Sequence, residues 1–201
     1  MKETGVIKFN CNWIKDKPVD FALFAEMNNW RNRLYSLGLI GVNRDGIGYG
    51  NISTRFFQNQ FIITGSSTGA IRNLTLDHYT KVTSYHIGNN SLTAQGPIIA
   101  SSESLTHAAI YEMNADIQAV IHVHHEMLWN KLIHKIPTSE KSIEYGTPAM
   151  ANEIRRLYIV TDLSVKKILI MGGHQDGVIT FGNSIQEAGA ILLEHFNLIK
   201  E

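Results

Sequence analysis

Hydrophobic residues recur along this chain with two different spacings, and each spacing predicts one kind of element. Apolar positions three and four apart predict a helix over residues 19–37, which Gly38 ends. The same spacing predicts a closing helix over residues 184–199, and Ser184-Ile185-Gln186-Glu187 has the form of a capping box. Two further helices are predicted in between, over residues 102–113, with Ser101 or Ser102 as the cap, and over residues 148–160.

Short apolar or alternating runs predict the strands, and small or polar residues separate several of them. These runs are residues 52–57, 61–64, 79–85, 91–95, 117–123, 168–171 and 178–181. Short turns between successive runs favour a mainly antiparallel sheet covered by helices. We therefore expect a single α/β domain over residues 1–201, with residues 1–18 as an N-terminal extension.

Composition and charge narrow the classes of protein to consider. Hydrophobic residues make up 44% of the chain and charged residues 18%, which is typical of a globular domain. Lys+Arg and Asp+Glu both number 18, so the zero net charge argues against a nucleic-acid partner. No apolar run is long enough to span a membrane. A single cysteine, Cys11, excludes an intrachain disulfide, and we expect a structural rather than reactive thiol and a cytoplasmic protein.

The most informative local signal is Ile121-His122-Val123-His124. Residues two apart on a strand project to the same face, so His122 and His124 should point at one place. Two converging imidazoles are half of a typical metal site. A pair of hydrogen-bonded histidines on a half-exposed strand would give the same pattern. Other residues of the chain are needed to distinguish a metal site from such a pair.

Several other polar groups are candidates for the same place. His174 lies in a polar loop between the last two predicted strands, where ligands often collect. Glu103 begins a predicted helix, where the helix dipole stabilises a carboxylate. The alternative to this structural role is a general base or a metal ligand that substrate displaces. Small-residue segments around Asn51, residues 64–69 and Ser101-Ser102 are individually typical of turns. Brought together, their hydroxyls and backbone amides could hold a phosphate.

The order of these motifs resembles that of the class II aldolase/adducin family. The motifs are Gly50-Asn51-x-Ser53, Ile63-Thr64-Gly65 leading to Thr68-Gly69, Ser101-Ser102-Glu103, His107-x-x-Ile110-Tyr111, Ala119 to His124, Gly177 to Gly182, and Ser184 to Ala188. The resemblance covers about residues 20 to 198. It implies an α/β fold of three α/β/α layers with a mainly antiparallel central sheet, and a homotetramer with sites at subunit interfaces.

The resemblance also implies a divalent metal, commonly zinc, that is held by three histidines. His122 and His124 match two of these ligands. The family's third histidine directly precedes the glycine that enters the last strand, but here Asp176 precedes that glycine and His174 lies two residues earlier. Because an imidazole suits zinc better beside two histidines, we expect His174 to complete the set, with Asp176 as the alternative.

The resemblance assigns roles to the remaining motif residues. Glu103 matches the catalytic acid/base. The segments that hold a substrate phosphate are matched by Asn51, Thr68, Gly69, Ser101 and Ser102. Two other histidines lie in or beside these motifs. We expect His125 to face outward beside the metal pair, and His107 to lie on a helix near the site. Tyr145 lies near the motifs without an assignable role.

We therefore predict a metal-dependent lyase of carbohydrate metabolism that cleaves a small phosphorylated sugar or other hydroxy-carbonyl substrate. The metal would act as a Lewis acid and stabilise an enediolate, while Glu103 would move a proton. An epimerase or dehydratase could use the same site. A non-catalytic adducin-like scaffold is the alternative from another class. Adducin-type domains lack the metal histidines, whereas this chain retains at least two, and that favours the enzyme.

Overall fold

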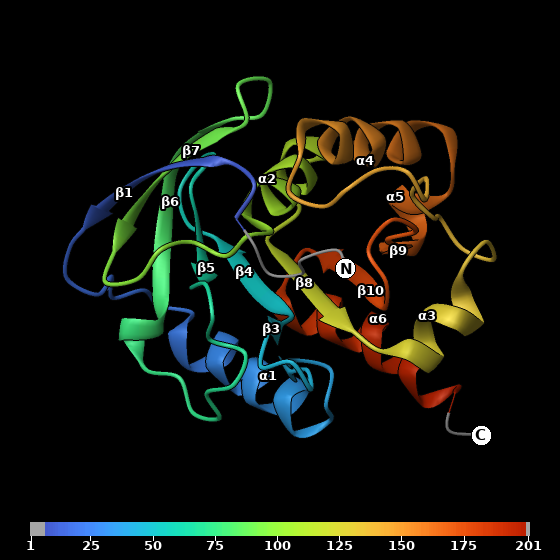
Figure 1. Ribbon diagram of the computed structural model, residues 1–201, viewed down its shortest axis with the longest axis horizontal. Helices are drawn as coiled ribbons and strands as arrows, with labels where there is room; N and C mark the ends of the chain where they lie inside the picture. The colour runs from blue at the N-terminus through green and yellow to red at the C-terminus, as the bar shows by residue number, and fades with distance from the viewer. Residues whose placement is uncertain (1–6, 200–201) are drawn as a thin grey trace.

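The computed structural model describes residues 7–199 and is built around one eight-stranded sheet (Figure 1). The strand order is β1-β7-β6-β5-β4-β8-β10-β9, and every neighbouring pair is antiparallel except β1 and β7. The strands are β1 (Asn10–Lys15), β4 (Asn51–Arg55), β5 (Phe61–Thr64), β6 (Tyr79–His86), β7 (Ser91–Gly96), β8 (Ala119–His124), β9 (Ile168–Ile170) and β10 (Gly177–Gly182). The predicted α/β fold with a mainly antiparallel central sheet is confirmed.

Helices cover both faces of the sheet (Figure 1). They are α1 (Phe24–Ser36), α2 (Ser104–Met113), α3 (Glu126–Leu132), α4 (Pro148–Val160), α5 (Leu163–Lys166) and α6 (Ile185–Asn197). Apolar side chains of α1, α3 and α6 share one buried cluster with one face of the sheet, and those of α2, α4 and α5 share another with the opposite face. None of the helices within residues 7–199 is long and apolar enough to cross a membrane.

Two helices, α1 and α2, start later than predicted, and α1 begins at Phe24 rather than at residue 19. The expected cap at Ser101 or Ser102 is wrong, because α2 begins at Ser104 with Glu103 in the N-cap position. The backbone carbonyl of Ser101 accepts bonds from both the amide and the hydroxyl of Ser104, so a tight turn precedes the helix. The closing helix has the predicted Ser184 cap, but the Glu187 carboxylate binds the Asn183 amide at 2.6 Å rather than that of Ser184.

The sequence patterns did not predict β1, α3, α5, the short 3-10 helix η1 (Leu76–His78) or the hairpin of β2 (Gly41–Val42) and β3 (Gly48–Tyr49). Strand β1 belongs to the predicted N-terminal extension, whose first six residues lie outside the described part of the chain. Most of its side chains are exposed, so it shows no alternation. Its backbone pairing with β7, and a 3.0 Å bond from Trp13 Nε1 to the Gly96 carbonyl, hold it instead.

Candidate metal centre and active site

Strand β8 presents two histidines on one face of the sheet. It lies between β4 and β10, and His122 faces Asn51 on one neighbour and Ile179 on the other. Ile121 packs into the cluster on the opposite face. His122 and His124 therefore project to the same side, as the spacing predicts, with their ring centroids 4.9 Å apart.

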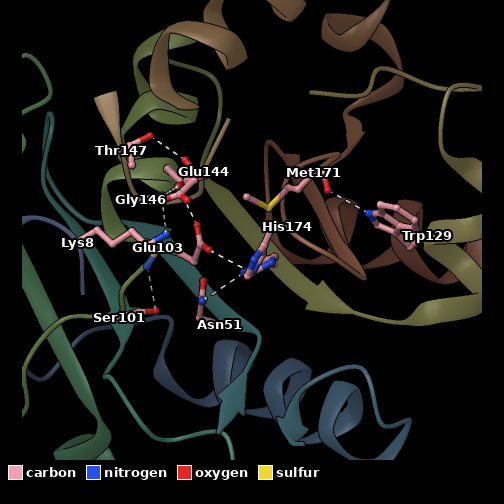
Figure 2. Close-up of polar contacts among 12 residues, drawn as sticks. Lys8, Asn51, Ser101, Glu103, Trp129, Glu144, Gly146, Thr147, Met171 and His174 are labelled. Carbon is pink, nitrogen blue, oxygen red and sulfur yellow. Dashed lines mark hydrogen bonds and ion pairs between the residues drawn. The ribbon is translucent and has the colours of Figure 1, made fainter. Parts of the chain in front are cut away.

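The turn between β9 and β10 adds a third imidazole. The ring of His174 lies 5.4 Å from that of His122 and 4.6 Å from that of His124. The possible ligand atoms of the three side chains all lie within 4.8 Å of one another. The Met171 carbonyl fixes this turn by accepting bonds from the His174 amide, at 3.2 Å, and from Trp129 Nε1, at 3.0 Å (Figure 2).

Asp176 has a different place in the same turn. Within residues 7–199, the side chains close enough to share one metal ion are those of the three histidines. Asp176 adopts a left-handed backbone conformation, with φ of 66°. Its carbonyl accepts the amide of His125 at 2.9 Å, which ties the turn to the end of β8. The structure thus brings His174, rather than Asp176, to the pair on β8.

Burial keeps the three imidazoles neutral. It lowers the pKa of His124 to about 4 and the pKa values of His122 and His174 well below the ordinary range. Neutral imidazoles offer the lone pairs that a metal ion requires. The buried Nε2 atom of His122 has no hydrogen-bond partner among residues 7–199, although buried polar atoms normally have one. The donor set and this unpartnered nitrogen fit a divalent metal such as zinc.

Glu103 lies beside this cluster, at the start of α2. One carboxylate oxygen, Oε2, accepts a 2.8 Å bond from the Thr106 hydroxyl. The other, Oε1, is buried without a hydrogen-bond partner in the described part of the chain and lies 3.6 Å from Nε2 of His174 (Figure 2). Burial raises the pKa of Glu103 to about 7, against the opposing effect of the Thr106 hydroxyl. A carboxyl group with such a pKa can accept a proton and return it near neutral pH.

The small-residue loops line the same cavity as the histidines and Glu103. A cavity of about 870 Å³ is lined by the three histidines, by Glu103 and by the residues to which the resemblance gives a phosphate role. Those residues are Asn51, Thr68, Gly69, Ser101 and Ser102. All the site residues expected from the sequence therefore lie around one cavity.

Tyr145 and Lys8 are neighbours of the site that the sequence left without a role. The buried ring of Tyr145 lies 4.3 Å from that of His174 and lines the cavity. Lys8, just before β1, places its ammonium group 4.0 Å from the centroid of the Tyr145 ring and 3.0 Å from Oε2 of Glu144. None of these three contacts has a local sequence signal, because each joins segments more than 25 residues apart.

Two more side chains lie behind the histidines. Asn51 Nδ2 is 3.5 Å from Nδ1 of His122, while Oδ1 of Asn51 is buried and has no hydrogen-bond partner among the described residues. Amide orientations are assigned from such networks, and a half-turn of this amide would let its oxygen accept a proton from Nδ1 of His122. His107 lies on α2 as expected and is fully buried, with Nδ1 at 2.7 Å from the Ser53 hydroxyl. His125, expected to face outward, is half-buried and caps α3 by accepting the Leu128 amide.

Comparison with known proteins identifies the family. Residues 42–199 match the profile of the Class II Aldolase and Adducin N-terminal domain. This chain belongs to that family. The resemblance drawn from the order of motifs is confirmed, whereas no curated protein sequence matches the chain.

Several solved structures share the fold at low sequence identity. An L-fuculose 1-phosphate aldolase superposes with a TM-score of 0.67 at 17% identity, over 90% of this chain and 84% of its own. YgbL of Escherichia coli, described as a candidate aldolase, epimerase or decarboxylase, gives 0.65 at 17% identity over 89% and 87%. The L-fuculose-1-phosphate aldolase of Thermus thermophilus gives 0.59 at 20% identity over 89% and 87%. At such identities the likeness establishes the fold alone.

Proposed function

We propose that this class II aldolase family member is a divalent-metal-dependent lyase that performs aldol-type cleavage of a small phosphorylated sugar or related hydroxy-carbonyl compound. One observation carries the proposal. Three neutral imidazoles converge beside a buried carboxyl group whose Oε1 lies 3.6 Å from the nearest of them, on the wall of one cavity. A non-catalytic scaffold has no need for such a costly buried polar cluster.

The three histidines would hold the metal, and three nitrogen ligands leave a coordination position for substrate. Zinc is the ion we propose, because imidazole is a common zinc ligand. When bound, a metal there supplies a Lewis acid that polarises a substrate carbonyl.

Glu103 would be the acid/base. Its Oε1 atom faces the histidine cluster and is not used by any protein donor in the described structure. Its Oε2 atom is fixed by Thr106, so the carboxyl group has one oriented and one available oxygen. With a pKa of about 7, the carboxylate can remove a proton from substrate, and the resulting carboxylic acid can return it to the product.

The other lining residues would hold the end of the substrate remote from the reacting carbon. Asn51, Ser101 and Ser102 offer an amide and two hydroxyls, and the loop with Thr68 and Gly69 offers backbone donors. Such groups bind phosphate without a net positive charge. The phosphorylated sugar named in the L-fuculose 1-phosphate aldolase supports this substrate class. The family relationship also supports a homo-oligomer, which light scattering can test.

Metal analysis and turnover test the proposal together. The purified protein should contain about one divalent metal ion per chain, and His122→Ala should lose it. Glu103→Gln should keep the metal but lose aldol turnover with dihydroxyacetone phosphate and a panel of aldehydes. Product analysis distinguishes cleavage from epimerisation or dehydration. A protein that binds no metal, or a Glu103→Gln variant with full turnover, would contradict the assignment.

A further inference from the structure

The charge of the residues that line the cavity bears on how it would meet a substrate anion. Among the described residues that line it, none is a lysine or an arginine, whereas Glu103, Glu126 and Asp176 are acidic. Besides the proposed metal ion, and Lys8 over the Tyr145 ring, a phosphate there can draw positive potential from a charge behind the wall.

Arg31 lies behind one wall of the cavity. It belongs to α1 and its side chain is only 1% exposed. Its guanidinium nitrogens donate to three backbone carbonyls of one loop, those of Thr68 at 2.9 Å, Gly69 at 3.3 Å and Arg72 at 2.7 Å. No carboxylate of the described residues forms an ion pair with it, so its charge is stabilised by these carbonyl dipoles and by the Tyr35 ring, whose centroid lies 4.8 Å from Cζ of Arg31. A buried charge without an opposite charge is costly, which makes an anion nearby favourable.

The three bonds also fix which way the loop amides point. Every described peptide bond is trans, and in a trans peptide the N–H points opposite to the C=O. Because the carbonyls of Thr68 and Gly69 turn towards Arg31, the amides of Gly69 and Ala70 turn away from it. These two residues line the cavity, and their amides donate to no group in residues 7–199.

The loop has little freedom to choose another shape. A Cβ atom on Gly69 would lie 2.2 Å from the Gly41 carbonyl oxygen, so the hairpin of β2 and β3 touches the loop backbone. Ser67 adopts a left-handed conformation with φ of 61°, which is uncommon for a residue other than glycine. Strained backbone of this kind often occurs in ligand-binding loops.

We propose that Arg31 is a positioning residue that aims the amides of residues 69–70 into the cavity, and that its buried charge strengthens the binding of a phosphate there. This role depends on the phosphate-binding part of the proposed function. The charge acts across one layer of peptides, where the low local dielectric screens it less than water would. Arg31 itself need not touch the ligand.

Binding of inorganic phosphate to the full-length, zinc-loaded protein tests this role. Calorimetry should show that Arg31→Gln, which removes the charge, raises the phosphate Kd about tenfold or more, and that Arg31→Lys, which keeps it, raises the Kd only about two- to fivefold. Arg33→Gln is the matched control, because Arg33 lies exposed on the same helix, and it should bind as the parent does. Zinc content and the unfolding temperature report whether each variant is folded.

The parent protein offers a second measurement that needs no variant. During a phosphate titration followed by amide NMR, the Gly69 and Ala70 signals should shift most. Phosphate binding that leaves these amides unmoved would overturn the proposal, as would equal phosphate affinity in Arg31→Gln and the parent. If Arg31→Lys is as weak as Arg31→Gln, the charge has no part and the proposal also fails.

These results are separable from the proposed reaction. Arg31-dependent phosphate binding without aldol turnover would contradict the lyase and leave the role of Arg31 standing. Turnover of a phosphorylated substrate with an unchanged KM in Arg31→Gln would contradict the role of Arg31 and leave the lyase standing.

Discussion

Nε2 of His174 lies 3.6 Å from Oε1 of Glu103, so the turn between β9 and β10 touches the first residue before α2. The distance is longer than a hydrogen bond, and burial keeps the imidazole neutral. The two atoms therefore face a common space without neutralising each other. A metal ligand and an acid/base can work on the same substrate from these positions.

The place of His174 gives a direct prediction for the third ligand. His174→Ala should weaken zinc binding by more than about 100-fold. Loss of a residue that only hydrogen-bonds to a metal ligand typically costs about 10- to 100-fold. Asp176→Ala should keep zinc affinity within about threefold, because Asp176 lies outside the cluster that the three histidines form. Competition with a chromophoric chelator measures both. The opposite ranking would make Asp176 the ligand.

Asn51 should control the orientation of His122. An acceptor beside Nδ1 would fix the tautomer in which Nε2 is free to bind metal. We expect Asn51→Leu to lower zinc affinity about 10- to 100-fold, and Asn51→Asp, which keeps an acceptor oxygen, to retain most of it. The same chelator competition compares them. Equal losses in the two variants would show that the acceptor is unimportant.

His107 should make the metal-free protein sensitive to acid. Burial lowers its pKa to about 3, whereas an unfolded histidine titrates near 6.5. Between these values the unfolded chain binds the extra proton, so stability falls as the pH falls, by about 1.4 kcal/mol per pH unit for this residue. His107→Gln should remove that part of the slope in urea titrations from pH 7 to 4. An unchanged slope would show that His107 is protonated in the native state.

Gly50 should tolerate no side chain, because two costs combine there. Its φ is 77°, and a Cβ atom would lie 2.7 Å from Cγ1 of Ile40 and 3.1 Å from the His122 carbonyl oxygen. We expect Gly50→Ala to lower the free energy of unfolding by about 2–4 kcal/mol. Gly46→Ala is the matched control, since φ is 78° but nothing lies within 4 Å, and it should cost about 1–2 kcal/mol. Urea unfolding measures both, and equal losses would exclude the contact.

Local sequence predicted the parts of the fold that local rules determine. The spacing of His122 and His124 was sufficient, because strand geometry alone sets their common direction. Helix α4 has the predicted bounds, with Thr147 as its cap and Pro148 at its start. Strand β1 could not be predicted in this way, because pairing with β7, rather than its own side-chain pattern, holds it in the extended conformation.

Ligand chemistry favoured His174 over Asp176 from the sequence alone, but the geometry that brings His174 to the pair depends on a turn that the left-handed Asp176 and the Met171 carbonyl shape together. Arg31 is an intermediate case. It follows Met27 by four residues and precedes Leu34 by three, so the helical period places it on the buried face of α1. The pattern could have identified a buried arginine, but its three carbonyl partners lie 37 to 41 residues away.

The position of β8 between β4 and β10 has a consequence for how the site forms. Two of the three imidazoles stand on the interior strand of a sheet that its own packing holds together. The entropy of ordering them is therefore lost when the chain folds, not when an ion arrives. Such a protein should remain native after chelation and reload rapidly, unlike small zinc domains that unfold without their metal.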